Sequence, residues 1–261
     1  MELELKDIQM TYAGRRDAES QLLKGITLKM EEGKITALVG GNGTGKTTLF
    51  NIISGFEKGF QGQVLLDGED VSRFPAHRIA RKGVGRLFQG RQLMEDLTLL
   101  ENMMIADDDH TGEKPFDTFL RHRKVAAKEA SRAKKAKEIL IRLFGENTPL
   151  LGKLGNKATE LSYGQQRLVA LARLLMGKNH LLLLDEPTSG VNPENIRTIG
   201  QTVREIADRD GMTVFLIEHN LDFVRSFADR CYYLKDGFIF RSGTPEEVLN
   251  DPEIRKDYVG L

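Results

Sequence analysis

The stretch Gly40–Thr48, which reads GGNGTGKTT, constrains the fold more than any other part of this 261-residue chain. It fits the pattern G-x-x-x-x-G-K-[ST], which joins a glycine-rich turn to a lysine and a hydroxyl residue at fixed spacing. A short apolar run, residues 35–39, comes before it, and helix-forming residues 46–54 follow it and end at Gly55. The pattern therefore predicts a buried strand, a tight loop and a helix, in that order.

This loop has the chemistry of a polyphosphate site. Glycines let backbone N–H groups point inward around an anion, and the following helix presents its positive end. The side chain of Lys46 can reach the β- and γ-phosphates, and the hydroxyl of Thr47 can bind Mg²⁺. An ordinary glycine-rich turn that caps a helix is the alternative. We expect the nucleotide to be bound by Gly40, Asn42, Gly43, Thr44, Gly45, Lys46, Thr47 and Thr48.

A strand with an acidic end supports the same chemistry. Four leucines, residues 181–184, precede Asp185 and Glu186. A buried strand that ends in a carboxylate suits the Mg²⁺ site of a nucleotide-hydrolysing protein, so Asp185 is the predicted metal ligand. Glu186 follows directly, where its carboxylate can polarise an attacking water. Taken alone, the pattern also fits an ordinary strand followed by an acidic turn.

The order of predicted elements favours an α/β fold, a P-loop NTPase core around a mainly parallel sheet. Residues 3–12 and 22–30 alternate apolar and polar side chains, which predicts an N-terminal antiparallel β-subdomain with a turn at Gly14–Asp17. Apolar runs at 213–217 and 230–234 continue the strand pattern, and Asp236-Gly237 predicts a late hairpin. We expect one domain over residues 1–261, with 1–91 and 177–261 as the core and 92–176 as an inserted helical subdomain.

The helical middle carries a dense basic run. Eight of the residues from Arg121 to Lys137 are Lys or Arg. Ala126, Ala130, Ala133 and Leu140 recur near helical spacing, which predicts one apolar stripe beneath a charged face. Such a run is typical of a solvated helix face, and contact with anionic lipid headgroups is the alternative. Residues 107–115 before it are expected to form a surface loop.

Composition excludes several classes of protein. Lys+Arg and Asp+Glu each number 38, so the formal net charge is zero and the basic excess typical of nucleic-acid binding is missing. Cys231 is the single cysteine, which excludes an internal disulfide framework and favours a reducing compartment. The sequence has no run of 18 apolar residues and no signal-peptide pattern at its start, so we expect a cytosolic protein.

The segment Leu161–Arg167, LSYGQQR, completes a set of three motifs. Its residues alone predict a helix start, because Ser162 can cap the helix and Gln165 can complete a capping box. The phosphate loop, this segment and the acidic strand, in that order, resemble the ATP-binding-cassette (ABC) ATPases over residues 3–259. In that family the segment contacts the γ-phosphate held by the other subunit of a dimer. The resemblance implies that Ser162, Gly164 and Gln165 complete the ATP site of a partner.

The resemblance also implies roles for single residues elsewhere. Gln89, in RLFQ, matches a glutamine that links Mg²⁺ and the attacking water to the transporter-facing subdomain. His219 matches a histidine that contacts the γ-phosphate and the water, and Glu186 then acts as the catalytic base. Tyr12 matches an aromatic residue that stacks on adenine. A purely structural role is the alternative for Gln89, His219 and Tyr12.

Details of the sequence narrow the resemblance within the family. Tyr163 in LSYGQQR, Asn192 in the loop after Glu186, and GTPEEV at 243–248 are similar to the ATP-binding subunits of branched-chain amino acid importers and their relatives, which include urea importers. Gly41 and Thr44 depart from the usual proline and alanine of the loop, and neither change removes a ligand. The expected function is ATP binding and hydrolysis in a membrane transporter that imports branched-chain amino acids or similar small polar solutes.

A subunit of this kind implies partners and a location. We expect transmembrane permease subunits, a second ATP-binding subunit in a homo- or heterodimer, and indirectly a periplasmic or extracellular solute-binding protein, but no nucleic acid. The protein would lie peripherally on the cytoplasmic face of the cell membrane. By resemblance a permease helix docks on Gln89–Glu101, where Leu97, Leu99 and Leu100 are the expected walls.

Three other functions remain open at this point. One is the ATPase of a lipid or lipopolysaccharide exporter, and another is a soluble ABC ATPase of cofactor assembly. The third is a simple P-loop kinase, which leaves the segment 161–167 and His219 without a joint purpose.

Overall fold

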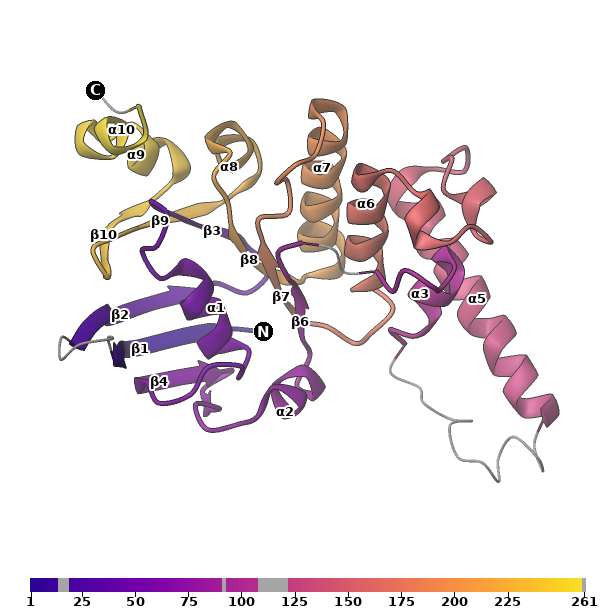
Figure 1. Ribbon diagram of the computed structural model, residues 1–261, viewed down its shortest axis with the longest axis horizontal. Helices are drawn as coiled ribbons and strands as arrows, with labels where there is room; N and C mark the ends of the chain where they lie inside the picture. The colour runs from indigo at the N-terminus through magenta and orange to yellow at the C-terminus, as the bar shows by residue number, and fades with distance from the viewer. Residues whose placement is uncertain (14–18, 91–92, 108–121, 260–261) are drawn as a thin grey trace. The chain divides into compact units, whose positions relative to one another are not determined.

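The computed structural model describes residues 1–13, 19–90, 93–107 and 122–259 (Figure 1). Over these residues the chain forms two compact units. The first consists of Met1–Phe88, His180–Ser189 and Ile199–Leu261, and the second of Gln89–Asn179 and Gly190–Thr198.

A six-stranded sheet forms the centre of the first unit. Its strands lie in the order β10-β9-β3-β8-β7-β6. Neighbouring strands are parallel except β10, which is antiparallel to β9. This confirms the predicted mainly parallel sheet. The strands are β3 (Ile35–Val39), β6 (Val84–Leu87), β7 (Leu181–Asp185), β8 (Thr213–Ile217), β9 (Arg230–Lys235) and β10 (Phe238–Gly243).

Three of these strands bring their carboxyl ends to one edge of the sheet. Strands β3, β7 and β8 are buried along their whole length, which explains why they read as continuous apolar runs. Strand β8 lies between the other two, and Ile217 is opposite both Leu38 of β3 and Asp185 of β7. The loops that follow the three strands therefore begin side by side, at the edge where open α/β sheets bind their ligands.

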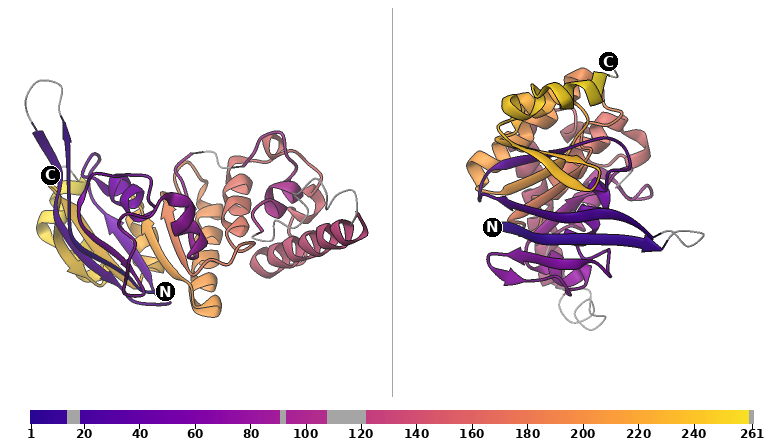
Figure 2. Two further views of the ribbon diagram at one scale, coloured as in Figure 1. Left: turned by 90° about the horizontal axis from the view of Figure 1, so that it is seen from below. Right: turned by 90° about the vertical axis from the view of Figure 1, so that its left-hand side faces the viewer.

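A four-stranded antiparallel sheet, in the order β2-β1-β4-β5, is the predicted N-terminal β-subdomain. Its long strands β1 and β2 pair along most of their length (Figure 2). Asp67 and Gly68 turn the chain between β4 and β5 with φ angles of 48° and 80°. The turn expected at Gly14–Asp17 lies outside the described residues. The strands are β1 (Leu3–Ala13), β2 (Glu19–Met30), β4 (Gln61–Leu66) and β5 (Glu69–Asp70).

The two sheets of the first unit share one apolar core with helix α1 (Lys46–Ile53). The rings of Phe50 on α1 and Phe215 on β8 approach to 4.9 Å between centroids. Helix α1 ends as predicted, since Ser54 is its C-cap and Gly55 follows with a φ of 75°. The other helices are α2 (Ala76–Arg81), α8 (Leu221–Phe227), α9 (Pro245–Leu249), α10 (Pro252–Val259) and α7 (Pro193–Asp210), which begins in the second unit.

The late hairpin predicted at Asp236-Gly237 joins β9 to β10. Both of its turn residues have positive φ, 51° at Asp236 and 84° at Gly237, as a two-residue hairpin of this kind requires. In the described parts of the chain, no helix combines the length and the apolar character that crossing a membrane requires.

The second unit is helical. It contains α3 (Leu99–Met104), α5 (His122–Phe144), α6 (Tyr163–Arg173) and the short 3₁₀ turns η1 (Leu151–Lys153) and η2 (Ala158–Glu160). Helix α3 packs against both α5 and α6. Asn102 of α3 is fully buried, and its side-chain amide donates to the carbonyl oxygens of Met94, Leu97 and Thr98. This one side chain fixes the loop that leads into α3.

The expected docking surface for a permease needs one correction in this unit. Leu99, predicted as a wall of the surface, is 0% exposed. It is the first residue of a helix that packs on two others, so its side chain belongs to the core of the unit. Leu97 and Leu100 are half-buried and remain candidates, and Met94 is exposed beside them in sequence.

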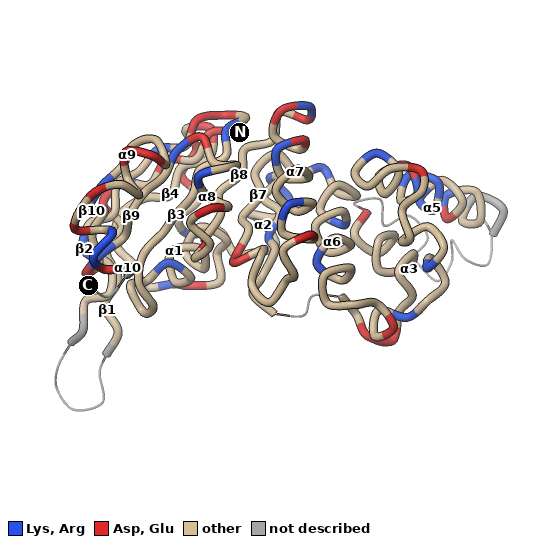
Figure 3. The backbone as a smooth tube through the Cα atoms, turned by 90° about the horizontal axis from the view of Figure 1, so that it is seen from above, with Lys and Arg blue, Asp and Glu red and all other residues tan. Residues whose placement is uncertain are grey.

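From residue 122 onward the basic run lies on α5, along which Lys and Arg recur (Figure 3). The expected apolar stripe is wrong in its first half, because Ala126 and Ala130 are exposed. Among the residues of this helix whose burial the structure describes, Ala136, Ile139 and Leu140 form the buried face, and they lie in its later turns. Within the run, Lys135 forms an ion pair of 2.9 Å with Asp107. The loop expected at 107–115 lies, beyond Asp107, outside the described residues.

Candidate functional site

The predicted phosphate loop connects β3 to α1, and its glycines permit close packing. A Cβ atom at Gly40 would lie 2.3 Å from the carbonyl oxygen of Leu234, so only glycine fits there. Gly45 has a φ of +105°, and a Cβ atom there would lie 2.6 Å from the side chain of Leu23. Helix α1 starts without a side-chain cap, which leaves its first N–H groups able to bind an anion.

Lys46 is folded back onto its own loop. Its ammonium group donates to the carbonyl oxygens of Gly40 at 2.9 Å and Gly41 at 2.7 Å, and the residue is 6% exposed. Burial lowers the pKa of Lys46, while the nearby carboxylates of Glu186 and Asp185 oppose that shift. The charge is therefore held in a site from which water is largely excluded, where a phosphate group would attract it strongly.

A cavity of about 190 Å³ brings the loop together with two residues from other strand ends. Glu186 follows β7 and His219 follows β8, and Nε2 of His219 lies 3.3 Å from Oε1 of Glu186. Glu186 has a φ of +48°, a conformation that non-glycine residues adopt at a cost and that turns its side chain away from the strand direction. The lining residues are Leu22, Asn42, Gly43, Gly45, Lys46, Thr47, Thr48, Glu186 and His219.

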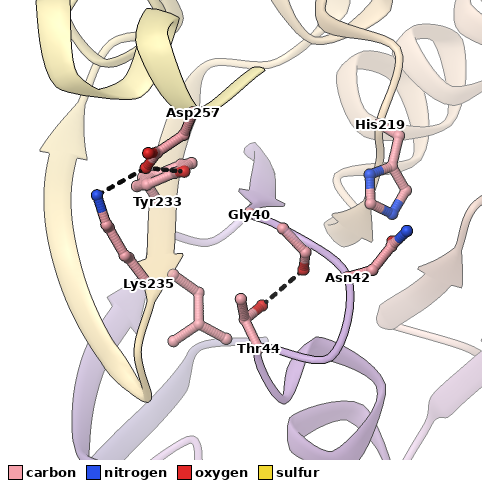
Figure 4. A pocket seen from close by; sticks show the side chains of 9 residues that line it. Gly40, Asn42, Thr44, His219, Tyr233, Lys235 and Asp257 are labelled. Carbon is pink, nitrogen blue, oxygen red and sulfur yellow. Dashed lines mark hydrogen bonds and ion pairs between the residues drawn. The ribbon is translucent and has the colours of Figure 1, made fainter. Parts of the chain in front are cut away.

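A second cavity, of about 400 Å³, lies along the other side of the phosphate loop (Figure 4). Gly40, Asn42 and Thr44 line it together with His219, and the hydroxyl of Thr44 donates to the carbonyl oxygen of Gly41 at 3.0 Å. Across the cavity, Asp257 of α10 accepts a hydrogen bond from Tyr233 and pairs with Lys235. The ion pair with Lys235, followed by the bond from Tyr233, lowers the pKa of Asp257.

Asp185, the predicted metal ligand, is 1% exposed and pairs with Arg86 of β6. Nη2 of Arg86 lies 3.5 Å from Oδ2 of Asp185, and Nη1 donates to the hydroxyl of Ser54 at 2.6 Å. Burial raises the pKa of Asp185, and Arg86 opposes that shift. Oδ1 of Asp185 is buried and has no hydrogen-bond partner among the described residues. An open carboxylate oxygen at this place fits a metal ion or one of its waters.

Arg86 was not predicted as a site residue from the sequence. Its guanidinium group lies among the rings of Phe50, Phe56 and Phe88. The guanidinium carbon is 4.4 Å from the centroid of the Phe88 ring. A single charged residue within an otherwise apolar strand was the available signal, because such a side chain is rarely buried without a partner.

Tyr12 lies beside the far end of the phosphate loop. Its hydroxyl donates to Glu57 at 2.8 Å, and a hydrogen bond also joins it to Thr48. Burial, followed by the bond to Glu57, raises the pKa of Tyr12. The residue is 41% exposed, so one part of its ring faces solvent and can stack on a planar group.

The remaining predicted site residues belong to the second unit. Ser162 caps α6: its hydroxyl accepts the N–H of Gln165 at 3.3 Å, and the Gln165 side chain accepts the N–H of Ser162 at 3.2 Å. The predicted capping box is thus confirmed. A Cβ atom at Gly164 would lie 2.3 Å from Nδ2 of Asn195, so a larger residue there would require the Asn195 side chain to move. Gln89 opens this unit and is exposed, and its part in metal binding stays a prediction.

Comparison with known proteins places this arrangement among transport ATPases. The ABC transporter family model matches residues 23–189. The chain is 32% identical over 258 residues to the high-affinity branched-chain amino acid transport ATP-binding protein BraF of Pseudomonas aeruginosa, covering 99% of this chain and 97% of that protein. It is 35% identical over 246 residues to a probable branched-chain amino acid transport ATP-binding protein, LivG, of Methanocaldococcus jannaschii, covering 93% of each.

Solved structures give the same result. A nucleotide-free ATP-binding cassette from an ABC transporter superposes with a TM-score of 0.81 at 33% identity, covering 100% of both chains. A dimeric cassette in a post-hydrolysis state, bound to ADP and phosphate, superposes with a TM-score of 0.75 at 26% identity, covering 93% of this chain and 98% of that one.

Proposed function

We propose a function from one premise: the chain belongs to the ABC transporter family. It is the ATP-binding and ATP-hydrolysing subunit of a membrane transporter that imports branched-chain amino acids or similar small polar solutes. The observation that carries the proposal is one cavity that the phosphate loop, Lys46, Glu186 and His219 line together. The names of the relatives, which are ATP-binding proteins of branched-chain amino acid transport, support the choice of cargo.

The phosphate loop binds ATP by an exchange of partners. Lys46 leaves the carbonyl oxygens of Gly40 and Gly41 and pairs with the β- and γ-phosphates, and the N-terminus of α1 adds backbone N–H donors. Asn42, Gly43, Thr44 and Thr48 complete the wall of the loop, and Tyr12 stacks on the adenine ring. All of these residues belong to the first unit, so the nucleotide is bound by one compact body.

The donor set at the acidic strand end fits Mg²⁺. Thr47 and Asp185 of the first unit would hold the ion, with the open Oδ1 of Asp185 as the protein oxygen of the acidic strand. When bound, Mg²⁺ neutralises charge on the phosphate oxygens during the reaction. Arg86 keeps Asp185 oriented through the other oxygen of the same carboxylate.

Glu186 and His219 activate and orient the attacking water. Their 3.3 Å contact places a carboxylate and an imidazole at the same mouth of the cavity. Glu186 takes the proton of the water as a general base, and His219 orients the water and the terminal phosphate. Positioning and electrostatics supply most of the catalysis in phosphoryl transfer, so this pair needs to be held accurately.

A second ATP-binding subunit completes the site. Ser162, Gly164 and Gln165 lie at the N-terminus of α6, where backbone N–H groups can meet a phosphate bound to the partner. The dimeric cassette among the structural relatives supports this arrangement. The dimer works with transmembrane permease subunits, and through them with a periplasmic or extracellular solute-binding protein, at the cytoplasmic face of the membrane.

Glu186→Gln tests the hydrolytic function. The substitution keeps the shape of the side chain but removes the base, so ATP should bind as in the wild type and turn over far more slowly. Unhydrolysed ATP then joins two subunits, and light scattering after size-exclusion chromatography should show an ATP-dependent dimer. Adding Ser162→Arg should abolish the dimer and leave ATP binding intact. Full turnover by Glu186→Gln, or a dimer that survives Ser162→Arg, would contradict the assigned roles.

Ser131→Arg is the matched control for that second substitution. Ser131 is an exposed serine on α5, so the same change in size and charge should leave the ATP-dependent dimer unaltered.

The cargo is tested with the permease subunits that co-purify with this chain. Vesicles that contain them should take up labelled leucine when ATP is supplied with the wild-type subunit, and not with Glu186→Gln. If the vesicles instead moved lipid or lipopolysaccharide with ATP and took up no amino acid, the protein would be assigned to an exporter and not to an importer.

A further inference from the structure

Glu218 is a buried carboxylate at the edge of the site. It follows the last residue of β8, precedes His219, and is 2% exposed. Charged side chains at this depth need partners, because the loss of hydration costs several kcal/mol. The chemistry of ATP hydrolysis described above gives Glu218 no task.

The regular hydrogen bonding between β7 and β8 ends next to Glu218. The last bond of this ladder runs from the N–H of Glu186 to the carbonyl oxygen of Ile217, at 3.0 Å. Beyond it both chains turn away from the strand direction, and their next N–H groups lose strand partners. Buried N–H groups without acceptors would destabilise both turns.

The carboxylate of Glu218 accepts these hydrogen bonds, with one oxygen for each chain. Oε1 accepts the N–H of Thr188, in the loop after β7, at 2.9 Å. Oε2 accepts the N–H groups of His219 at 3.1 Å and Asn220 at 3.3 Å, in the loop after β8. Burial raises the pKa of Glu218, and the hydrogen bonds from Thr188, Asn220 and His219 oppose the rise.

The two loops joined in this way carry the two residues that face the attacking water. Glu186 lies two residues before Thr188, and His219 is itself one of the donors. Glu186 also holds a φ of +48°, which needs surrounding restraint to persist. We infer that Glu218 is a positioning residue: its carboxylate fixes the loop after β7 to the loop after β8 and so aligns Glu186 with His219. This inference rests on the proposed function and concerns the same site.

The geometry demands a glutamate. The side chain must be long enough to place one acceptor oxygen toward each loop. Glutamine has the same length, but its NH₂ group would face an N–H donor on one of the two sides. Aspartate keeps both oxygens, but it is one methylene shorter and cannot reach both loops from the same backbone position.

Glu218→Gln is therefore the principal test. The catalytic rate constant for ATP should fall about tenfold or more, because small displacements of catalytic groups are costly. The dissociation constant for ATP should change by less than about threefold, because the phosphate loop is untouched. Glu218→Asp should also lower the catalytic rate constant, and it replaces Glu218→Gln as the test if the glutamine variant does not fold. A rate within about twofold of the wild type for either folded variant would overturn the inference.

Asp229→Asn is the matched control. Asp229 is also a carboxylate that accepts a backbone N–H, from Ile35 at 2.8 Å, at the opposite end of the sheet. The same chemical change there should leave the catalytic rate constant of the folded protein unaltered, measured well below its melting temperature.

A double-mutant comparison separates alignment from general structural support. A link that aligns two side chains has nothing to align once one of them is removed. In a His219→Ala background, Glu218→Gln should therefore lower the residual rate by less than about twofold. The same fold-loss in both backgrounds would show a merely structural role. If the wild type hydrolyses ATP and Glu218→Gln does not slow it, this inference alone is overturned. If the wild type does not hydrolyse ATP, the proposed function is overturned.

Discussion

Replacing Arg86 with methionine tests whether its ion pair with Asp185 stabilises the core of the first unit. The two side chains are 6% and 1% exposed, and 3.5 Å separates Nη2 from Oδ2. Methionine is unbranched and flexible, so it can fill the space among the three phenylalanine rings that surround the guanidinium group. The substitution therefore removes a charge and its hydrogen bonds more than it removes packing.

The size of the effect follows from the burial of the pair. At an effective dielectric constant of about 20, unit charges 3.5 Å apart attract by about 5 kcal/mol. The free energy of unfolding loses less than this, because Asp185 can take up a proton when its partner is gone. Breaking a buried pair from one side usually costs about 3–5 kcal/mol. We expect a loss of about 3 kcal/mol for Arg86→Met near neutral pH.

The loss of unfolding free energy in Arg86→Met should also depend on pH, and the pKa of Asp185 determines the direction of that dependence. The pKa of Asp185 is raised in the folded protein above the ordinary value of 3.8, first by burial, while Arg86 lowers it. A raised pKa means that the folded state favours the protonated acid, so stability is lost as pH rises through the folded-state pKa. Without Arg86 that pKa rises further and the loss extends to higher pH. The deficit of Arg86→Met should therefore be larger at neutral pH than near pH 5.

Urea unfolding followed by circular dichroism, without nucleotide or Mg²⁺, measures these changes. Asp185→Asn added to Arg86→Met should recover about 1 kcal/mol or more, since it removes the uncompensated charge. Arg204→Met is the control: Arg204 pairs with Asp208 and Asp229 but is 29% exposed, so its loss should be about 1 kcal/mol or less. A deficit for Arg86→Met no larger than for Arg204→Met, or one that grows as pH falls, would refute the reasoning.

Two further predictions concern single side chains in the first unit. Lys46→Met should weaken ATP binding about 10- to 150-fold by calorimetry, because a charged hydrogen-bond partner of phosphate contributes about 1.5–3 kcal/mol; wild-type affinity would contradict the phosphate-loop assignment. Cys231 is fully buried, and burial raises the pKa of its thiol to about 12. Iodoacetamide should therefore leave the native protein unlabelled near pH 8 and modify it only in urea, whereas rapid labelling of the native protein would disprove this burial.

Local patterns predicted the elements of the core well, because their signals lie within a few residues. The strand–loop–helix at 35–54 and the turn at Asp236-Gly237 depend on backbone conformations that the residues themselves favour. The stripe on α5 failed because helical spacing shows which residues share a face, not how far along the helix a neighbour covers it. Only packing against other helices decides that length, and it leaves Ala126 and Ala130 exposed.

The residues of the site also differ in whether a local motif or a distant contact identifies them. Lys46 and Glu186 could be predicted as site residues because each stands in a local motif, whereas Arg86 and Glu218 contact residues on other segments of the chain. Arg86 meets Asp185 because β6 and β7 are parallel neighbours, with Leu87 opposite Leu184. Glu218 meets Thr188 because β7 lies beside β8. Which strands become neighbours is a property of the topology, and a single sequence without that order cannot pair residues so far apart.

The two sides of the site differ in how their polar groups are satisfied, and this bears on how ATP binds. The basic side satisfies itself, because Lys46 already donates to Gly40 and Gly41. The acidic side keeps one oxygen of Asp185 without a protein partner among the described residues. A phosphate bound at Lys46, as proposed, would thus replace existing hydrogen bonds, so its net contribution would be the difference between two sets of bonds. A metal ion bound at Asp185, as proposed, would instead satisfy a buried oxygen that otherwise weakens the fold, so stabilisation by Mg²⁺ with ATP should exceed that by ATP alone.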